Sequence, residues 1–115
     1  MIKPMLYDVV EILYPIEEVN LPAGTQGTLV HQHTEDVFEV EFVNEQGETT
    51  ALHALDRNHF VVVWQAETEE DVSLVEQVAQ VVALLPPQAR TQVLDFARFL
   101  SLRQTQQAAS TSLAA

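Results

Sequence analysis

The chain lacks cysteine and has few basic residues, and both shortages restrict its chemistry. Without cysteine there is no disulfide, no thiolate nucleophile and no cysteine-ligated metal. Five lysine and arginine residues stand against seventeen aspartate and glutamate residues, so the 115 residues carry a net charge of −12. Such a charge repels phosphate backbones and anionic membrane surfaces. We therefore expect neither nucleic acid nor a membrane as a partner.

Long hydrophobic runs are also missing. No window reaches the roughly 18 uncharged apolar residues that a membrane span requires. The N-terminal segment meets Pro4 and Asp8 before any apolar run of signal-peptide length. Hydrophobic residues still make up 47% of the chain, which is the composition of a folded protein. The sequence predicts a cytoplasmic, bacterial-type protein.

The first half of the chain has the pattern of β-strands. Residues 38–42 alternate three large apolar side chains with Glu39 and Glu41, which gives one apolar and one charged face. Gly24 and Gly27, three residues apart, suit a tight turn or bulge. The predicted strands cover residues 7–13, 28–33, 37–43, 48–55 and 60–64. Short strands joined by one long early loop and tight later turns predict a five-stranded SH3-like β-barrel over residues 1–66.

The second half has the pattern of helices, so the predicted fold class is α+β. Residues 67–71 read as an acidic linker in which Thr68 caps a helix. Apolar residues then recur at helical spacing, and Pro86 and Pro87 end one helix and open the next. We expect a helical hairpin over residues 72–103 and a disordered tail over residues 104–115.

The two predicted helices differ in their apolar faces. In the first, Leu74, Val75 and Val78 fall in the apolar half of the helical wheel, whereas Gln77 and Gln80 fall in the polar half. The second has more apolar residues than one packed face accounts for, so the barrel, a second copy or another protein must cover them. The residues predicted to form this partner or dimer interface are Leu94, Phe99, Leu102, Phe96 and Val93.

Few side chains have the spacing of metal ligands or of a ligand-binding site. Alternation along a strand sends His31 and His33 to one face, a workable geometry for two zinc ligands, with His53 or His59 as a possible third. No third ligand stands at a definite spacing, so we predict no metal and no cofactor, and keep a metal- or ligand-binding barrel as an alternative. A second alternative is an aromatic groove for proline-rich peptides, built from Trp64, Phe60 and Tyr7.

The remaining polar residues do not predict an enzyme. Glu39 and Glu41 share a strand face, but acid–base catalysis needs a cleft and a raised pKa, which an exposed strand face does not supply. The serines lie in helical or tail contexts without a nucleophile elbow. Gly24 and Gly27 lack the lysine and helix start of a phosphate-binding loop. We therefore predict no catalytic residue.

Each half of the chain resembles an uncharacterised bacterial family. Residues 8–11, 21–30, 38–42 and 49–52 resemble a small family of SH3-like proteins of unknown function, over residues 5–64. The blocks at residues 84–87 and 93–96, with Phe99 and Leu100, resemble a family of short helical proteins often found in antitoxin-like settings, over residues 72–103. The first resemblance implies a fold and no catalytic residues, and the second implies a protein partner.

Together these observations favour a non-enzymatic protein–protein interaction module. An acidic surface suits an antitoxin-like or immunity-like inhibitor of a basic protein, because opposite charge speeds association. The alternatives are self-association through the C-terminal helices and a structural accessory subunit of a larger complex.

Overall fold

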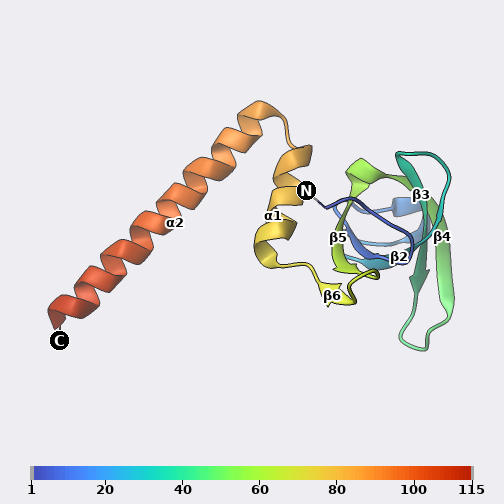
Figure 1. The fold of residues 1–115 in the computed structure, drawn as a ribbon, viewed down its shortest axis with the longest axis horizontal. Coiled ribbons are helices and arrows are strands. Elements are labelled where there is room, and N and C mark those ends of the chain that lie inside the picture. Colours follow the sequence, from blue (N-terminus) through green and yellow to red (C-terminus); the bar gives the residue numbers. More distant parts are fainter. Residues whose placement is uncertain (1, 115) are drawn as a thin grey trace. The chain divides into compact units, whose positions relative to one another are not determined.

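An antiparallel sheet and two C-terminal helices make up the fold in the computed structural model, which describes residues 2–114 and the side chains of residues 2–107 (Figure 1). The strands are β1 (Val9–Ile12), β2 (Gln26–Gln32), β3 (Val37–Val43), β4 (Thr49–Asp56), β5 (Phe60–Gln65) and β6 (Glu70–Asp71). Two 3₁₀ segments, η1 (Glu17–Val19) and η2 (Arg57–His59), lie between strands. The helices are α1 (Leu74–Leu84) and α2 (Pro87–Ala114). The chain forms two units, Met1–Val81 and Val82–Ala115, which are described separately below.

The sheet is open. Its strand order is β4-β3-β2-β1-β5-β6, and β4 and β6 are its two edges. The α+β class is confirmed, whereas the predicted five-stranded SH3-like barrel is wrong. Closure would require hydrogen bonds between the outer edges, but β6 is only two residues long and is already paired with the end of β5. The strands instead form a strongly curved, open sheet (Figure 1).

The core lies against the inward face of this sheet. Phe38, Val40 and Phe42 are at most 2% exposed, as their alternation with glutamate predicts. Register shifts in three of the strand pairs mark bulges, which increase local twist and bend a sheet around its contents. The buried core cluster comprises Val10, Ile12, Ile16, Leu29, Phe38, Val40, Phe42, Leu55, Phe60, Val62 and Val72.

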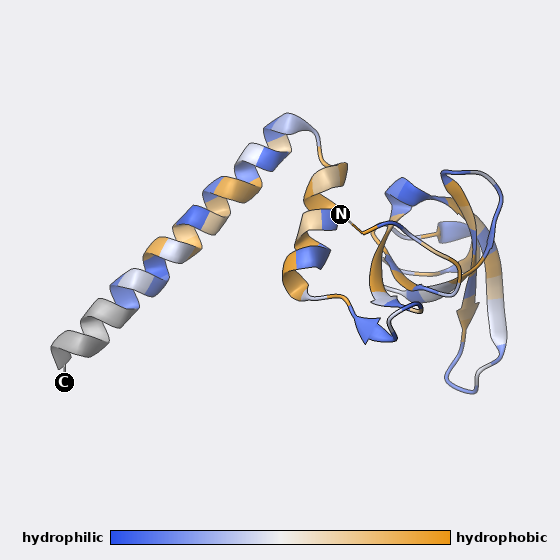
Figure 2. Ribbon diagram, in the orientation of Figure 1, coloured by the Kyte–Doolittle hydropathy of each residue, from blue (hydrophilic) through white to orange (hydrophobic). Residues whose placement is uncertain are grey.

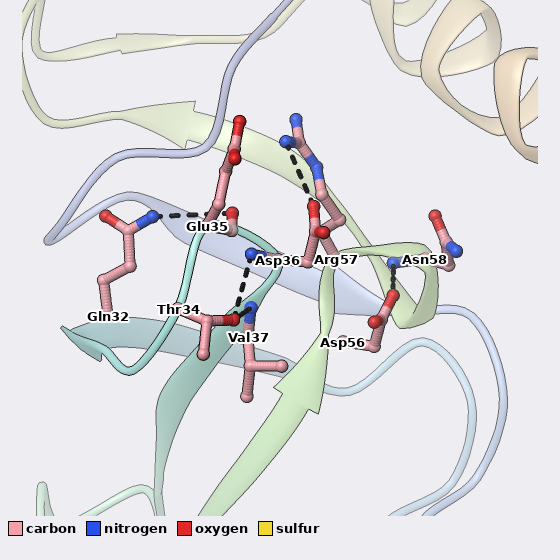
Figure 3. Close-up of polar contacts among 8 residues, drawn as sticks. All are labelled: Gln32, Thr34, Glu35, Asp36, Val37, Asp56, Arg57 and Asn58. Carbon is pink, nitrogen blue, oxygen red and sulfur yellow. Dashed lines mark hydrogen bonds and ion pairs between the residues drawn. The ribbon is translucent and has the colours of Figure 1, made fainter.

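Polar contacts tie the β2–β3 turn to η2, directly after β4 (Figure 3). The Thr34 hydroxyl accepts hydrogen bonds from the backbone N–H groups of Asp36 and Val37, at 3.2 and 3.1 Å, which orders the turn. The Arg57 guanidinium lies 3.8 Å from the Asp36 carboxylate, and the Arg57 N–H donates to the Asp36 carbonyl at 2.8 Å. Asp56 caps η2 by accepting from the Asn58 N–H at 2.9 Å.

A buried carboxylate joins the N-terminal segment to the turn after β5. Asp8 is 2% exposed, and its two oxygens accept hydrogen bonds from the backbone N–H groups of Met5, at 3.0 Å, and Ala66, at 2.9 Å. Backbone donors to a carboxylate form strong hydrogen bonds, and they offset the cost of removing the charge from water. Asp8 therefore fastens two segments that lie 58 residues apart in sequence.

We expect Asp8→Asn to lower the free energy of unfolding by about 1–3 kcal/mol, because the amide nitrogen replaces one of the two acceptors. The measurement is urea unfolding followed by tryptophan fluorescence. Glu45→Gln removes the same charge from the exposed β3–β4 turn and should change the free energy by less than about 0.5 kcal/mol. Equal effects of the two variants would contradict the anchoring role of Asp8.

Helix α1 meets the sheet through a glutamine. The side-chain amide of Gln80 donates to the Val62 carbonyl and accepts from the Val62 N–H, each at 2.8 Å. The carboxamide thus replaces a neighbouring strand at the edge of β5, where a peptide group would otherwise lack a partner. Gln80 is 9% exposed. Its place in the polar half of the helical wheel does not indicate this contact.

The second unit contains the junction of the two helices. The Arg90 Nε and Nη2 atoms donate to the carbonyl oxygens of Val82, at 3.1 Å, and Ala83, at 2.9 Å, and so cap the end of α1. α1 ends before Pro86 and α2 begins at Pro87, as the two prolines predict. Two helices are confirmed, and their pairing as a hairpin stays a prediction.

Helix α2 is longer than the sequence indicates. It continues through Ala114, so residues 104–114 are helical where we expected a disordered tail, and Ala115 lies outside the described residues. Neither α1 nor α2, as far as the structure describes them, combines the length and hydropathy needed to cross a membrane.

Candidate functional site

Helix α2 carries large apolar side chains that are exposed. Leu94, Phe96, Phe99 and Leu102 are 49–61% exposed, and Val93 is half-buried. These five residues, which we call the α2 apolar surface, are the predicted interface set. Hydrophobic segments recur along the helix in Figure 2. Isolated apolar residues are common on protein surfaces, but five within ten helical positions concentrate exposed apolar area around this part of the helix, without sharing one face.

The two aromatic rings of this surface lie close together, beside an arginine. The Phe96 and Phe99 ring centroids are 6.2 Å apart with the ring planes inclined at 32°. The Arg103 guanidinium carbon lies 5.7 Å from the Phe99 centroid, within the range of a cation–π interaction. Nearby, the Arg98 side chain donates to the Asp95 carboxylate at 3.4 Å. Aromatic and arginine side chains of this kind dominate the energetics of protein interfaces.

A second exposed apolar face lies on α1, within the first unit. Leu74 is 78% exposed, Val75 is 79% exposed and Val78 is 55% exposed. The sequence placed these residues in the apolar half of the helix, which usually packs on a core. Gln80 contacts the sheet from another side of the helix, so these three side chains remain exposed. The exposure of this face follows from the contact between the sheet and the helix, and the sequence pattern does not indicate it.

Charge is divided unevenly between the two units. Sixteen of the seventeen acidic residues precede residue 82, whereas Arg90, Arg98 and Arg103 follow it together with a single aspartate. The sheet unit is therefore strongly acidic and the second unit carries a small positive charge. A field of this strength over the sheet attracts cationic partners and raises their association rate.

The histidines do not gather into a metal site. The His31 and His33 rings are neighbours, with centroids 4.8 Å apart, and His33 Nε2 lies 2.6 Å from a Glu39 carboxylate oxygen. His53 lies 3.9 Å from Glu18, and His59 bonds the carbonyl of Tyr14 at 3.0 Å. Among residues 2–114, no three histidine, aspartate or glutamate side chains are arranged to hold a metal ion.

The two strand carboxylates are engaged separately. Glu39 contacts His33, whereas Glu41 accepts a hydrogen bond from the Thr49 hydroxyl at 3.0 Å. Both glutamates lie on the outward face of β3, opposite the core. Their contacts support a role in holding the outer face of the sheet together.

The predicted groove of three aromatic residues does not form. Phe60 is 2% exposed and belongs to the core, whereas Tyr7 is 62% exposed in the N-terminal segment. Trp64 instead lines a groove on the outward face of β1 and β5. Alternation along β5 allowed Phe60 and Trp64 to share a face, but the register shift between Val9 and Val10 changes the alignment of β5 with β1.

Residues 6–62 match the model of a family described as Domain of unknown function (DUF4926). The matched range begins before β1, ends within β5 and stops short of both helices. It supports the expected membership of this region in an uncharacterised family. The SH3-like character of that family and the second, helical family stay predictions. No match was found among curated proteins or among solved structures.

Proposed function

We propose that the chain is a non-enzymatic interaction module that binds a basic protein, in the manner of an antitoxin-like or immunity-like inhibitor. The observation that carries this proposal is the α2 apolar surface, whose aromatic side chains are more than half exposed in Phe96 and Phe99. Burying such side chains against a partner removes apolar area from water, at roughly 25 cal/mol per Å².

The charge of the sheet unit supports a basic partner. Self-association would bring two acidic sheet units together, and like charges disfavour that association. A basic protein gains from the same field, because attraction increases the rate of encounter and the apolar surface then slows dissociation. The two units thus have complementary roles in one binding event.

The test uses the full chain with a photo-crosslinking amino acid at position 99, expressed in its native host. Gln46 is the control position, because it lies in the exposed β3–β4 turn, outside the α2 apolar surface. We expect the probe at position 99 to trap one basic protein. Equal trapping from both positions, or trapping of the same chain alone, would contradict the proposal.

With the trapped protein purified, Phe99→Asp should weaken binding by about 30-fold, because a central aromatic residue contributes about 2 kcal/mol or more to an interface. Gln46→Asp introduces the same charge outside the α2 apolar surface and should change the affinity by less than about twofold. Both affinities are measured by calorimetry at fixed ionic strength. Light scattering of the isolated chain should give the monomer mass of 12.9 kDa, and a dimer mass would contradict the proposal.

A further inference from the structure

A groove of about 670 Å³ lies on the outward face of the sheet, within the first unit. It is separate from the α2 apolar surface, which belongs to the second unit. The residues that line it come from β1, β2, β5, β6 and α1. They are Val9, Glu11, Gln26, Val63, Trp64, Asp71 and Gln77.

Strand pairing brings the key side chains of this groove together. Val9 pairs with Trp64, and Trp64 pairs with Asp71, so three residues lie in one row across β1, β5 and β6. Directly paired residues project from the same face of a sheet. Glu11 follows Val9 by two positions and therefore shares its face.

The groove combines an indole with two carboxylates. Trp64 is the only tryptophan of the chain and is half-buried, so part of its ring remains accessible. Within the part of the chain that the structure describes, neither the Glu11 nor the Asp71 carboxylate makes a hydrogen bond or an ion pair with another side chain. Val9 and Val63 add apolar surface beside the ring.

This combination fits a cationic side chain better than any other ligand. A lysine or arginine lays its methylene groups along apolar surface and keeps its charged end among acceptors. The indole face attracts the cation, and the two carboxylates attract its charge. An anionic ligand is repelled by both carboxylates, and a purely apolar ligand leaves them desolvated without a partner.

We propose that this groove binds a lysine or arginine side chain of the basic partner, with Trp64, Glu11 and Asp71 as the recognition residues. The inference rests on the proposed function and names a chemical feature that the partner must present. The basic side chain gives the partner a fixed position on the sheet unit, in addition to its contact with α2.

The test is a fluorescence titration of the full chain, because Trp64 reports on the groove without any label. The probe is a tetra-arginine peptide amide at roughly physiological ionic strength, where long-range attraction is screened beyond about 8 Å. We expect a saturable change in the emission of Trp64. A tetra-citrulline peptide of nearly the same shape lacks the charge and should produce no saturable change.

Two double variants distinguish the effect of the groove on peptide binding from the effect of the overall charge. Glu11→Gln with Asp71→Asn should weaken peptide binding by about tenfold, because both attracting carboxylates are lost. Glu45→Gln with Glu48→Gln removes the same charge from the exposed β3–β4 turn and should weaken binding by less than about twofold. Equal weakening by both double variants would overturn the inference, and so would saturable binding of the citrulline peptide.

The outcome is independent of the test of the proposed function. Phe99→Asp lies in the second unit and should leave the peptide titration unchanged. If the peptide binds at the groove but position 99 traps no basic protein, the proposed function fails and the cation site stands. If position 99 traps a basic protein whose affinity is insensitive to Glu11→Gln with Asp71→Asn, the groove inference fails.

Discussion

Replacing Gly27 with valine is expected to leave most of the chain unfolded in urea-free buffer. A Cβ atom at position 27 would lie 2.6 Å from Val40 Cγ1, 2.9 Å from Phe42 Cε1 and 3.0 Å from the Glu41 carbonyl oxygen. Val40 and Phe42 are at most 1% exposed, so neither can move without displacing other core residues. Even Gly27→Ala should lower the free energy of unfolding by about 1–3 kcal/mol through overpacking.

A double-mutant cycle tests this explanation. Val40→Ala removes the Cγ1 atom that the new Cβ would approach most closely, so Gly27→Ala should cost less in that background than in the natural sequence. Urea unfolding of the four proteins gives the coupling free energy. Gly47→Ala is the control for backbone effects of replacing a glycine. Gly47 has a φ of +81°, and an added Cβ atom there would meet no other atom. No coupling between positions 27 and 40 would contradict the steric account.

Replacing Gln80 with methionine should have the second-largest effect, a loss of about 2–4 kcal/mol in the free energy of unfolding. Methionine has a similar volume but offers no partner to the Val62 N–H or carbonyl, and each buried group without a partner costs about 1–3 kcal/mol. Amide hydrogen exchange at Val62 provides a direct second measurement. Its protection should fall in Gln80→Met even where the protein stays folded.

Two further variants sharpen the interpretation. Gln80→Glu retains an acceptor for the Val62 N–H but places a carboxylate against the Val62 carbonyl, so it should not restore stability. Gln77→Met removes a single, partly buried hydrogen bond to the Val72 carbonyl and should cost about 1 kcal/mol. If Gln77→Met and Gln80→Met are equally destabilising, the bridging role of Gln80 is wrong.

These two residues show where sequence-based prediction stopped. Gly24 and Gly27 both indicated a bend, but only Gly24 has a positive φ, of +92°. Gly27 is required because two core side chains approach its backbone, a contact between β2 and β3 that local spacing does not encode. Gln80 lies in the polar half of its helix, and nothing in that pattern distinguishes it from a solvated glutamine.

The candidate surfaces were predicted to different extents. The exposure of Leu94, Phe96, Phe99 and Leu102 agrees with the excess of apolar residues on the second helix. The groove around Trp64 was missed, because its lining comes from four strands and α1 and depends on the pairing of Val9 with Trp64 and of Trp64 with Asp71. The metal-ligand hypothesis for His31 and His33 had no third ligand at a definite spacing, and the described residues hold no group of three.

By itself, the sequence determined the features that arise within one segment. Alternation set which face of β3 enters the core, two prolines set the boundary between α1 and α2, and composition set the acidic charge. Tertiary structure alone decided that the sheet stays open, that a glutamine completes the edge of β5 and that Trp64 lines one groove with two carboxylates. The physical reason is that the periodicity of a strand or helix fixes the direction of each side chain. The partner that the side chain meets depends on the register between segments far apart in the chain.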